Sequence, residues 1–80
     1  MQNRINQIML LPDGKKHLII DQAIYNETSY FLTCRLNENN KVTNEISVVE
    51  EVIANNDTYV RTVKDPDLFQ KLLEYFYKNL

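Results

Sequence analysis

The sequence has few of the residues that staple a small protein or mark a catalytic site. Its 80 residues include one cysteine, one histidine, one glycine and no tryptophan. One cysteine cannot form an internal disulfide, and with one histidine it cannot supply the three or four ligands that a zinc ion requires. We therefore expect no metal or cofactor, and we expect apolar packing to be the main source of stability.

Long apolar runs are also absent. None approaches the roughly 20 residues that cross a bilayer, and the apolar stretch at residues 8–11 is too short for a signal peptide. The single cysteine agrees with a reducing compartment. We expect one domain over residues 1–80 that resides in the cytoplasm and does not enter a membrane.

Neither sign of charge dominates the chain. Eleven acidic and nine basic residues give a formal net charge of -2. Nucleic acids and anionic membranes are bound through clustered basic surfaces, so neither is expected as the main partner. Because a core of this size leaves a thin margin of stability, another protein or a second copy in a homodimer is the expected partner.

Four turn signals divide the first two thirds of the chain into short segments. They lie at residues 12–15, 26–28, 37–40 and 55–57, and the first contains Gly14, which can adopt a positive φ. The intervening segments are 5–11, 16–24, 30–36, 46–53 and 58–63. They are rich in β-branched and aromatic residues. This spacing predicts a four- or five-stranded antiparallel β-meander over residues 5–63, with a curled half-barrel as one form of it.

The last segment has a helical period. Asp65 is a suitable N-cap before Pro66, and Asp67 places an acid in the first turn. The apolar stripe comprises Leu68, Phe69, Leu72, Leu73, Phe76 and Leu80. A helix over residues 66–79 should pack this stripe on one face of the meander, which gives an α+β fold.

The order of these elements resembles domain-of-unknown-function family 1292 of low-GC Gram-positive bacteria. The stretches that carry the resemblance are LPDGK at residues 11–15, IYN at 24–26 with YFL at 30–32, and DPDLF at 65–69. The resemblance implies a strand-rich fold with a short helical tail. It implies no activity and no site residue.

The residues available for catalysis are few and separated. His17 is the only candidate base, and Ser29, Ser47 and Cys34 are the conceivable nucleophiles. We expect His17 to be solvent-exposed beside a hairpin and Cys34 to be a small buried hydrophobe between Leu32 and Leu36. The sequence therefore predicts no enzyme and no catalytic, cofactor-binding or metal-binding residue.

The candidate interface lies in the helical tail and on one face of the sheet. Tyr75 and Tyr77 flank the core residue Phe76, and tyrosine suits interfaces because it is amphipathic with few torsions to freeze. The alternative is that Tyr77 only rims the core with its hydroxyl in water. On the sheet, Phe31, Val49 and Ile53 would supply the exposed residues of an open face.

These observations favour a small non-enzymatic protein-binding or regulatory module in a bacterial cytoplasm, encoded by a phage or another mobile element. Two alternatives stay open. One is a nucleic-acid-associated accessory protein that uses the hairpin around Lys15 and Lys16. The other is a self-associating structural subunit whose open sheet closes only against a second copy.

Overall fold

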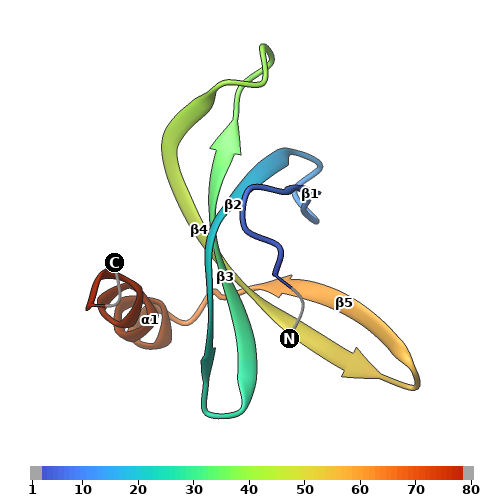
Figure 1. Ribbon diagram of the computed structural model, residues 1–80, viewed down its shortest axis with the longest axis vertical. Coiled ribbons are helices and arrows are strands. Elements are labelled where there is room, and N and C mark those ends of the chain that lie inside the picture. Colours follow the sequence, from blue (N-terminus) through green and yellow to red (C-terminus); the bar gives the residue numbers. More distant parts are fainter. Residues whose placement is uncertain (1–2, 79–80) are drawn as a thin grey trace.

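The computed structural model describes residues 3–78, and within them it contains five strands followed by one helix (Figure 1). The elements are β1 (Ile8–Leu10), β2 (Lys16–Tyr25), β3 (Thr28–Leu36), β4 (Val42–Ala54), β5 (Asp57–Thr62) and α1 (Pro66–Lys78). The strands form one antiparallel sheet in the order β1-β2-β3-β4-β5. The predicted α+β meander is confirmed, and its sheet curls into a half-barrel.

Asparagine-rich tight turns join the long strands. Asn26 and Glu27 connect β2 to β3 with φ values of 49° and 67°, and Asn55 and Asn56 connect β4 to β5 with 52° and 69°. Two-residue loops with positive φ at both positions are type I′ turns, whose twist matches that of the strands. Gly14, with φ 79°, completes the β1–β2 turn as predicted.

Two interruptions in register curl the sheet. One lies in β2 between Ile19 and Asp21, and the other lies where β3 and β4 pair, between Cys34 and Leu36. At the second interruption Thr43 donates to the Arg35 carbonyl at 2.8 Å and accepts from the Glu45 N–H at 3.2 Å. Such bulges bend a strand and increase its twist, so the two halves of the sheet can face each other.

Each face of the curled sheet carries one buried cluster. The cluster on the helix side contains Tyr30, Leu32, Val48, Val63, Leu72 and Phe76. The cluster inside the curl contains Leu11, Ile19, Phe31 and Val49, with Met9 and Val60 packed against it. The prediction that Phe31 and Val49 lie on an open sheet face is wrong, because the curl covers that face and leaves them 1% and 0% exposed.

Helix α1 begins as its sequence predicts. The Asp65 carboxylate accepts a hydrogen bond from the Asp67 N–H at 3.0 Å, and Leu72 and Phe76 are each 1% exposed against the sheet. The predicted last helical residue, position 79, and the stripe residue Leu80 lie outside the described residues. Across residues 3–78, no helix has the length and apolar character needed to span a membrane.

Candidate functional site

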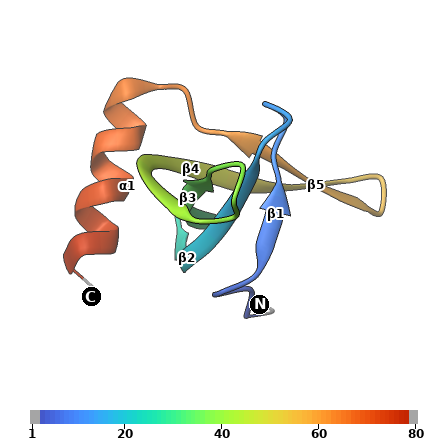
Figure 2. The same ribbon diagram turned by 90° about the horizontal axis from the view of Figure 1, so that it is seen from above.

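Helix α1 covers only part of the sheet face on which it packs. Figure 1 looks nearly along α1 while β2, β3 and β4 run up the picture, and Figure 2 shows α1 lying across them. A helix is about 10–12 Å wide, which is the length of three or four strand residues at about 3.3 Å each. Since β4 has 13 residues, α1 leaves the upper part of the face without a covering element.

The uncovered part carries two cross-strand rows of residues, which are apolar except for Lys16 in the second row. In one row Ile8 of β1 pairs with Leu18 of β2, Leu18 pairs with Cys34, and Cys34 pairs with Ile46 of β4. The next row along the strands contains Leu10 of β1 paired with Lys16 of β2, and Leu36 of β3 paired with Val42 of β4. Cys34 and Leu36 are buried beneath their neighbours.

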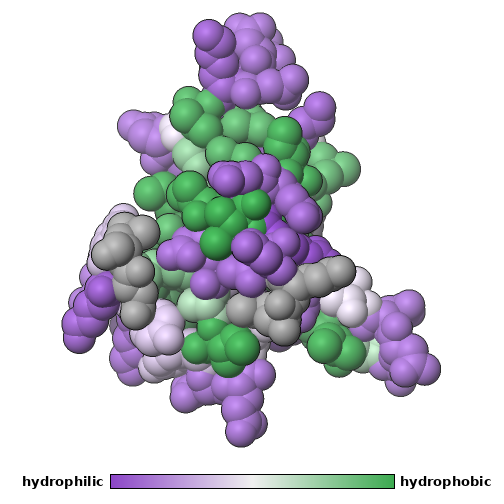
Figure 3. All heavy atoms as spheres, in the orientation of Figure 1, coloured by the Kyte–Doolittle hydropathy of each residue, from purple (hydrophilic) through white to green (hydrophobic). Residues whose placement is uncertain are grey.

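We call the outer members of these rows the apolar end face: Ile8, Leu10, Leu18, Val42 and Ile46. Ile8, Leu10, Val42 and Ile46 are 57%, 67%, 60% and 40% exposed. Figure 3 shows hydrophobic residues gathered over the upper half of the molecule, where Figure 1 places β1, β2 and the upper part of β4. Contiguous exposed apolar residues of this kind mark interaction surfaces in soluble proteins.

The tyrosines predicted to form an interface have different surroundings. Tyr77 is 55% exposed, whereas the half-buried Tyr75 ring packs edge-on against Tyr25 with 5.8 Å between centroids. Ile53, the third predicted sheet residue, is 71% exposed near the tip of the β4–β5 hairpin. The structure therefore does not bring the five predicted interface residues together on one surface.

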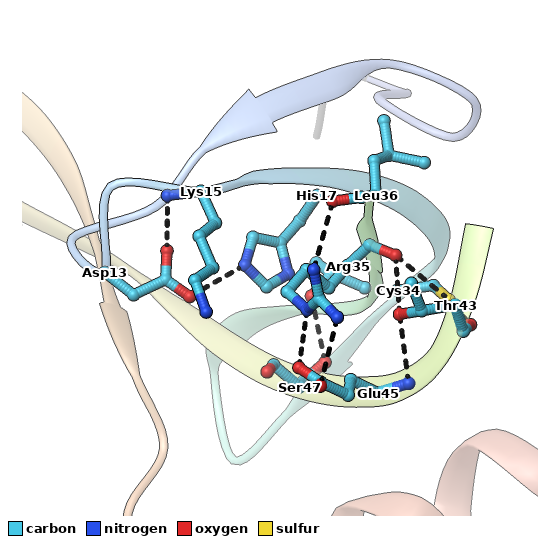
Figure 4. A network of polar contacts seen from close by, with 10 residues as sticks. Asp13, Lys15, His17, Cys34, Arg35, Leu36, Thr43, Glu45 and Ser47 are labelled. Atoms are coloured by element: carbon cyan, nitrogen blue, oxygen red, sulfur yellow. Dashed lines mark hydrogen bonds and ion pairs between the residues drawn. The ribbon is translucent and has the colours of Figure 1, made fainter. Parts of the chain in front are cut away.

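His17 is buried, so the prediction that it is solvent-exposed is wrong. Its side chain lies inside the curl at 2% exposure, and its Nε2 is 3.0 Å from the Asp13 carboxylate (Figure 4). Its other ring nitrogen, Nδ1, has no hydrogen-bond partner in the described part of the chain. Asp13 belongs to the β1–β2 turn, so this turn supplies the polar partner of the buried imidazole.

The structure does not assemble His17 with any of the three conceivable nucleophiles. Ser29 pairs with Ile24, at the far end of the β2–β3 ladder from His17. Cys34 is buried, as predicted, and its thiol donates to the Thr43 carbonyl of the bulge. Ser47 uses its backbone carbonyl to accept a hydrogen bond from Thr33.

Cations near the His17 end of the sheet are partly paired. Arg35 donates through its guanidinium to Glu45, and this hydrogen bond and ion pair raises the pKa of Arg35 and lowers that of Glu45 (Figure 4). Lys15 and Lys16 line a hollow of about 430 Å³ beside Arg35. Two lysines next to an arginine that is paired with Glu45 provide only a small electrostatic attraction for the phosphates of a nucleic acid.

Comparisons with family models, curated proteins and solved structures found no match to this chain. The resemblance to family 1292 therefore stays a prediction. The surfaces of the molecule itself are the basis for inferring its function.

Sequence reasoning missed the apolar end face. Alternation along β3 and β4 correctly indicated a continuous apolar face, and that pattern was the available signal. The direction in which α1 crosses the strands decides how much of the face is covered. That direction depends on side-chain packing between elements far apart in the sequence, which the pattern of one segment does not contain.

Proposed function

We propose that this chain is a small non-enzymatic protein-binding or regulatory module of the bacterial cytoplasm, and that its partner covers the apolar end face. The observation that carries the proposal is the exposure of Ile8, Leu10, Val42 and Ile46 on one uncovered part of the sheet. Burial of such side chains contributes about 25 cal/mol for each Å² removed from water. The face thus offers a favourable free energy of association that the isolated chain does not use.

The face suits a protein better than a polyanion. Its exposed side chains are aliphatic, and the chain carries a net charge of -2. A nucleic-acid complex needs several cations at phosphate spacing. The cations at this end are dispersed: Lys16 pairs with Leu10 and Lys41 precedes Val42. Arg35, which lines a hollow with Lys15 and Lys16, is already paired with Glu45.

The test compares the tagged full-length chain with its Ile8→Ser/Val42→Ser variant in a lysate of the source organism. We expect the unchanged chain to retain a stoichiometric protein and the double variant to bind it at least about tenfold more weakly, since buried anchors dominate interface energy. Mass spectrometry names the retained protein. Sedimentation velocity of the chain alone shows whether that protein is a second copy.

Two matched controls carry the same kind of change elsewhere. Ile53→Ser and Tyr77→Ser alter residues that are 71% and 55% exposed but lie outside the apolar end face. All variants should keep the circular dichroism of the parent, because the altered side chains are exposed. Equal retention by the double variant, or loss only in Ile53→Ser and Tyr77→Ser, would contradict the proposal.

A further inference from the structure

Strand β5 is an edge of the sheet with unpaired backbone groups. The turn at Asn55 and Asn56 is flanked by the paired residues Ala54 and Asp57. At the other end of β5, the Val63 N–H donates to the Val48 carbonyl at 2.9 Å. In an antiparallel ladder, hydrogen-bonded pairs alternate with pairs whose N–H and C=O groups point away from each other. Residues 57, 59, 61 and 63 therefore bond to β4.

The alternate residues of β5 face outward. They are Thr58, Val60 and Thr62, whose N–H and C=O groups point away from β4. Among residues 3–78, no further strand of the sheet lies on that side of β5. An edge of this kind can accept one more strand through main-chain hydrogen bonds. Because those bonds require an extended partner, the backbone itself specifies the conformation of what binds.

An apolar hollow lies beside this edge. It measures about 490 Å³, and its lining includes Pro12, Tyr59, Val60, Thr62, Val63 and Leu68. Of its lining residues, Tyr59 is 50% exposed and Val63 is 9% exposed. The hollow runs along consecutive residues of β5, so a strand paired with β5 would place alternate side chains in it.

Of the two cations that line the hollow, one is paired with an acid and the other has no ion pair within the described residues. Arg61 is bound to Glu50 across the β4–β5 pair, and the Asp65 carboxylate caps α1. Lys64, at the end of the hollow, forms no ion pair among residues 3–78. An acidic side chain on the occupant would pair with Lys64, since the neighbouring Asp65 carboxylate is engaged at the start of α1.

The geometry points to a peptide-binding edge at β5: an extended segment of another protein pairs with Thr58, Val60 and Thr62 as a sixth strand, places an apolar side chain in the adjoining hollow and an acidic side chain near Lys64. This surface shares no residue with the apolar end face. It therefore stands independently of the function proposed above.

A phage-displayed library of random dodecapeptides, panned on the full-length chain, tests the inference. The matched variants are Thr62→Pro, which removes an outward N–H without removing a bond to β4, and Thr62→Val, which keeps that N–H. We expect enriched peptides to combine alternating apolar residues with an acid. They should bind Thr62→Pro about tenfold more weakly than Thr62→Val, because one backbone hydrogen bond is lost.

Nuclear magnetic resonance provides the second measurement. The bound peptide should slow hydrogen exchange at the amides of Thr58, Val60 and Thr62. The substitution Lys64→Glu should lower the affinity for acidic peptides by about tenfold. Equal binding to Thr62→Pro and Thr62→Val, or no enrichment on the parent over Thr62→Pro, would overturn the inference. A dimer of the chain alone that Thr62→Pro abolishes would also overturn it, by making a second copy the occupant.

An Ile8→Ser/Val42→Ser chain should bind the peptides as the parent does. If that variant loses its lysate partners and still binds the peptides, the two surfaces act independently of each other. Loss of peptide binding in that variant would contradict the independence of the β5 edge.

Discussion

Asp13 illustrates how one side chain in a turn can support a buried residue. Its carboxylate accepts from the Lys15 N–H at 2.8 Å and lies 3.0 Å from His17 Nε2. Partial desolvation raises the pKa of Asp13, but hydrogen bonds from the Lys15 N–H and from His17, with the electrostatic interactions of Asp13 with both residues, lower it by more, so that the net shift is downward. A carboxylate whose pKa is lowered in the folded state stabilises the fold above its ordinary pKa.

This shift predicts a pH dependence of stability. The contribution of Asp13 is fully present above about pH 5 and is lost as the pH falls below 3.8, the ordinary value, through the lower folded pKa. Asp13→Asn keeps an acceptor for the Lys15 N–H but has no charge to lose. Urea midpoints measured between pH 6 and pH 3 should therefore fall less in this variant than in the parent.

The control for this experiment is Asp57→Asn. It removes an exposed carboxylate that forms no ion pair within residues 3–78. This variant should follow the acid-induced loss of the parent. If Asp13→Asn and Asp57→Asn flatten the pH dependence equally, the interaction of Asp13 with His17 is not its source.

At the scale of elements, α1 is held to the sheet by an apolar stripe centred on Leu72 and Phe76, with Leu68, Phe69 and Leu73 packed beside them. Phe76 and Leu72 are each 1% exposed, while the next residue along, Tyr77, is 55% exposed. Adjacent positions on a helix point about 100° apart, so one residue can be central to the core and its neighbour peripheral to it. The half-buried Tyr75 belongs to the packed side through its contact with Tyr25.

Truncation of Phe76 should lower the free energy of unfolding far more than truncation of its neighbour Tyr77. Phe76→Ala is expected to lower the free energy of unfolding by about 3–5 kcal/mol, because it leaves a cavity between α1 and the sheet. Tyr77→Ala should change it by less than about 0.5 kcal/mol. Chemical denaturation measures both, and Phe76→Leu replaces Phe76→Ala if the latter does not fold. Similar losses for Phe76 and Tyr77 variants would refute the docking of α1 described here.

At the scale of the whole molecule, stability should be distributed unevenly. Strand β3 lies at the centre of the sheet and is buried on both faces, including Phe31, Leu32 and Thr33 at 1%, 4% and 0% exposure. The β4–β5 hairpin instead extends away from the body of the protein (Figure 1) and exposes Ile53 and Tyr59. Regions with few buried contacts open at lower free energy.

Native-state hydrogen exchange should reveal this gradient. We expect the amides of Phe31, Leu32 and Thr33 to exchange last and those of residues 53–59 to exchange first. Exchange of both regions at one rate would show that the hairpin opens only with the whole molecule. The same spectra provide the reference for peptide protection at β5.

The local sequence determined the elements. Period-two alternation, asparagine turns and the Asp65–Pro66 helix start depend on interactions within a few residues, so the meander, its turns and α1 could be predicted with boundaries shifted by a few residues. Cys34 was predicted to be buried for the same reason, because its apolar neighbours Leu32 and Leu36 share its face.

Only the tertiary structure decided which surfaces stay open. The bulges at Ile20 and at Thr43 curl the sheet, and the curl buries Phe31, Val49 and His17, which the sequence pattern placed at the surface. The crossing direction of α1 leaves the apolar end face uncovered, and the missing sixth strand leaves β5 as an edge. These features arise from contacts between residues distant in the chain, so no segment encodes them by itself.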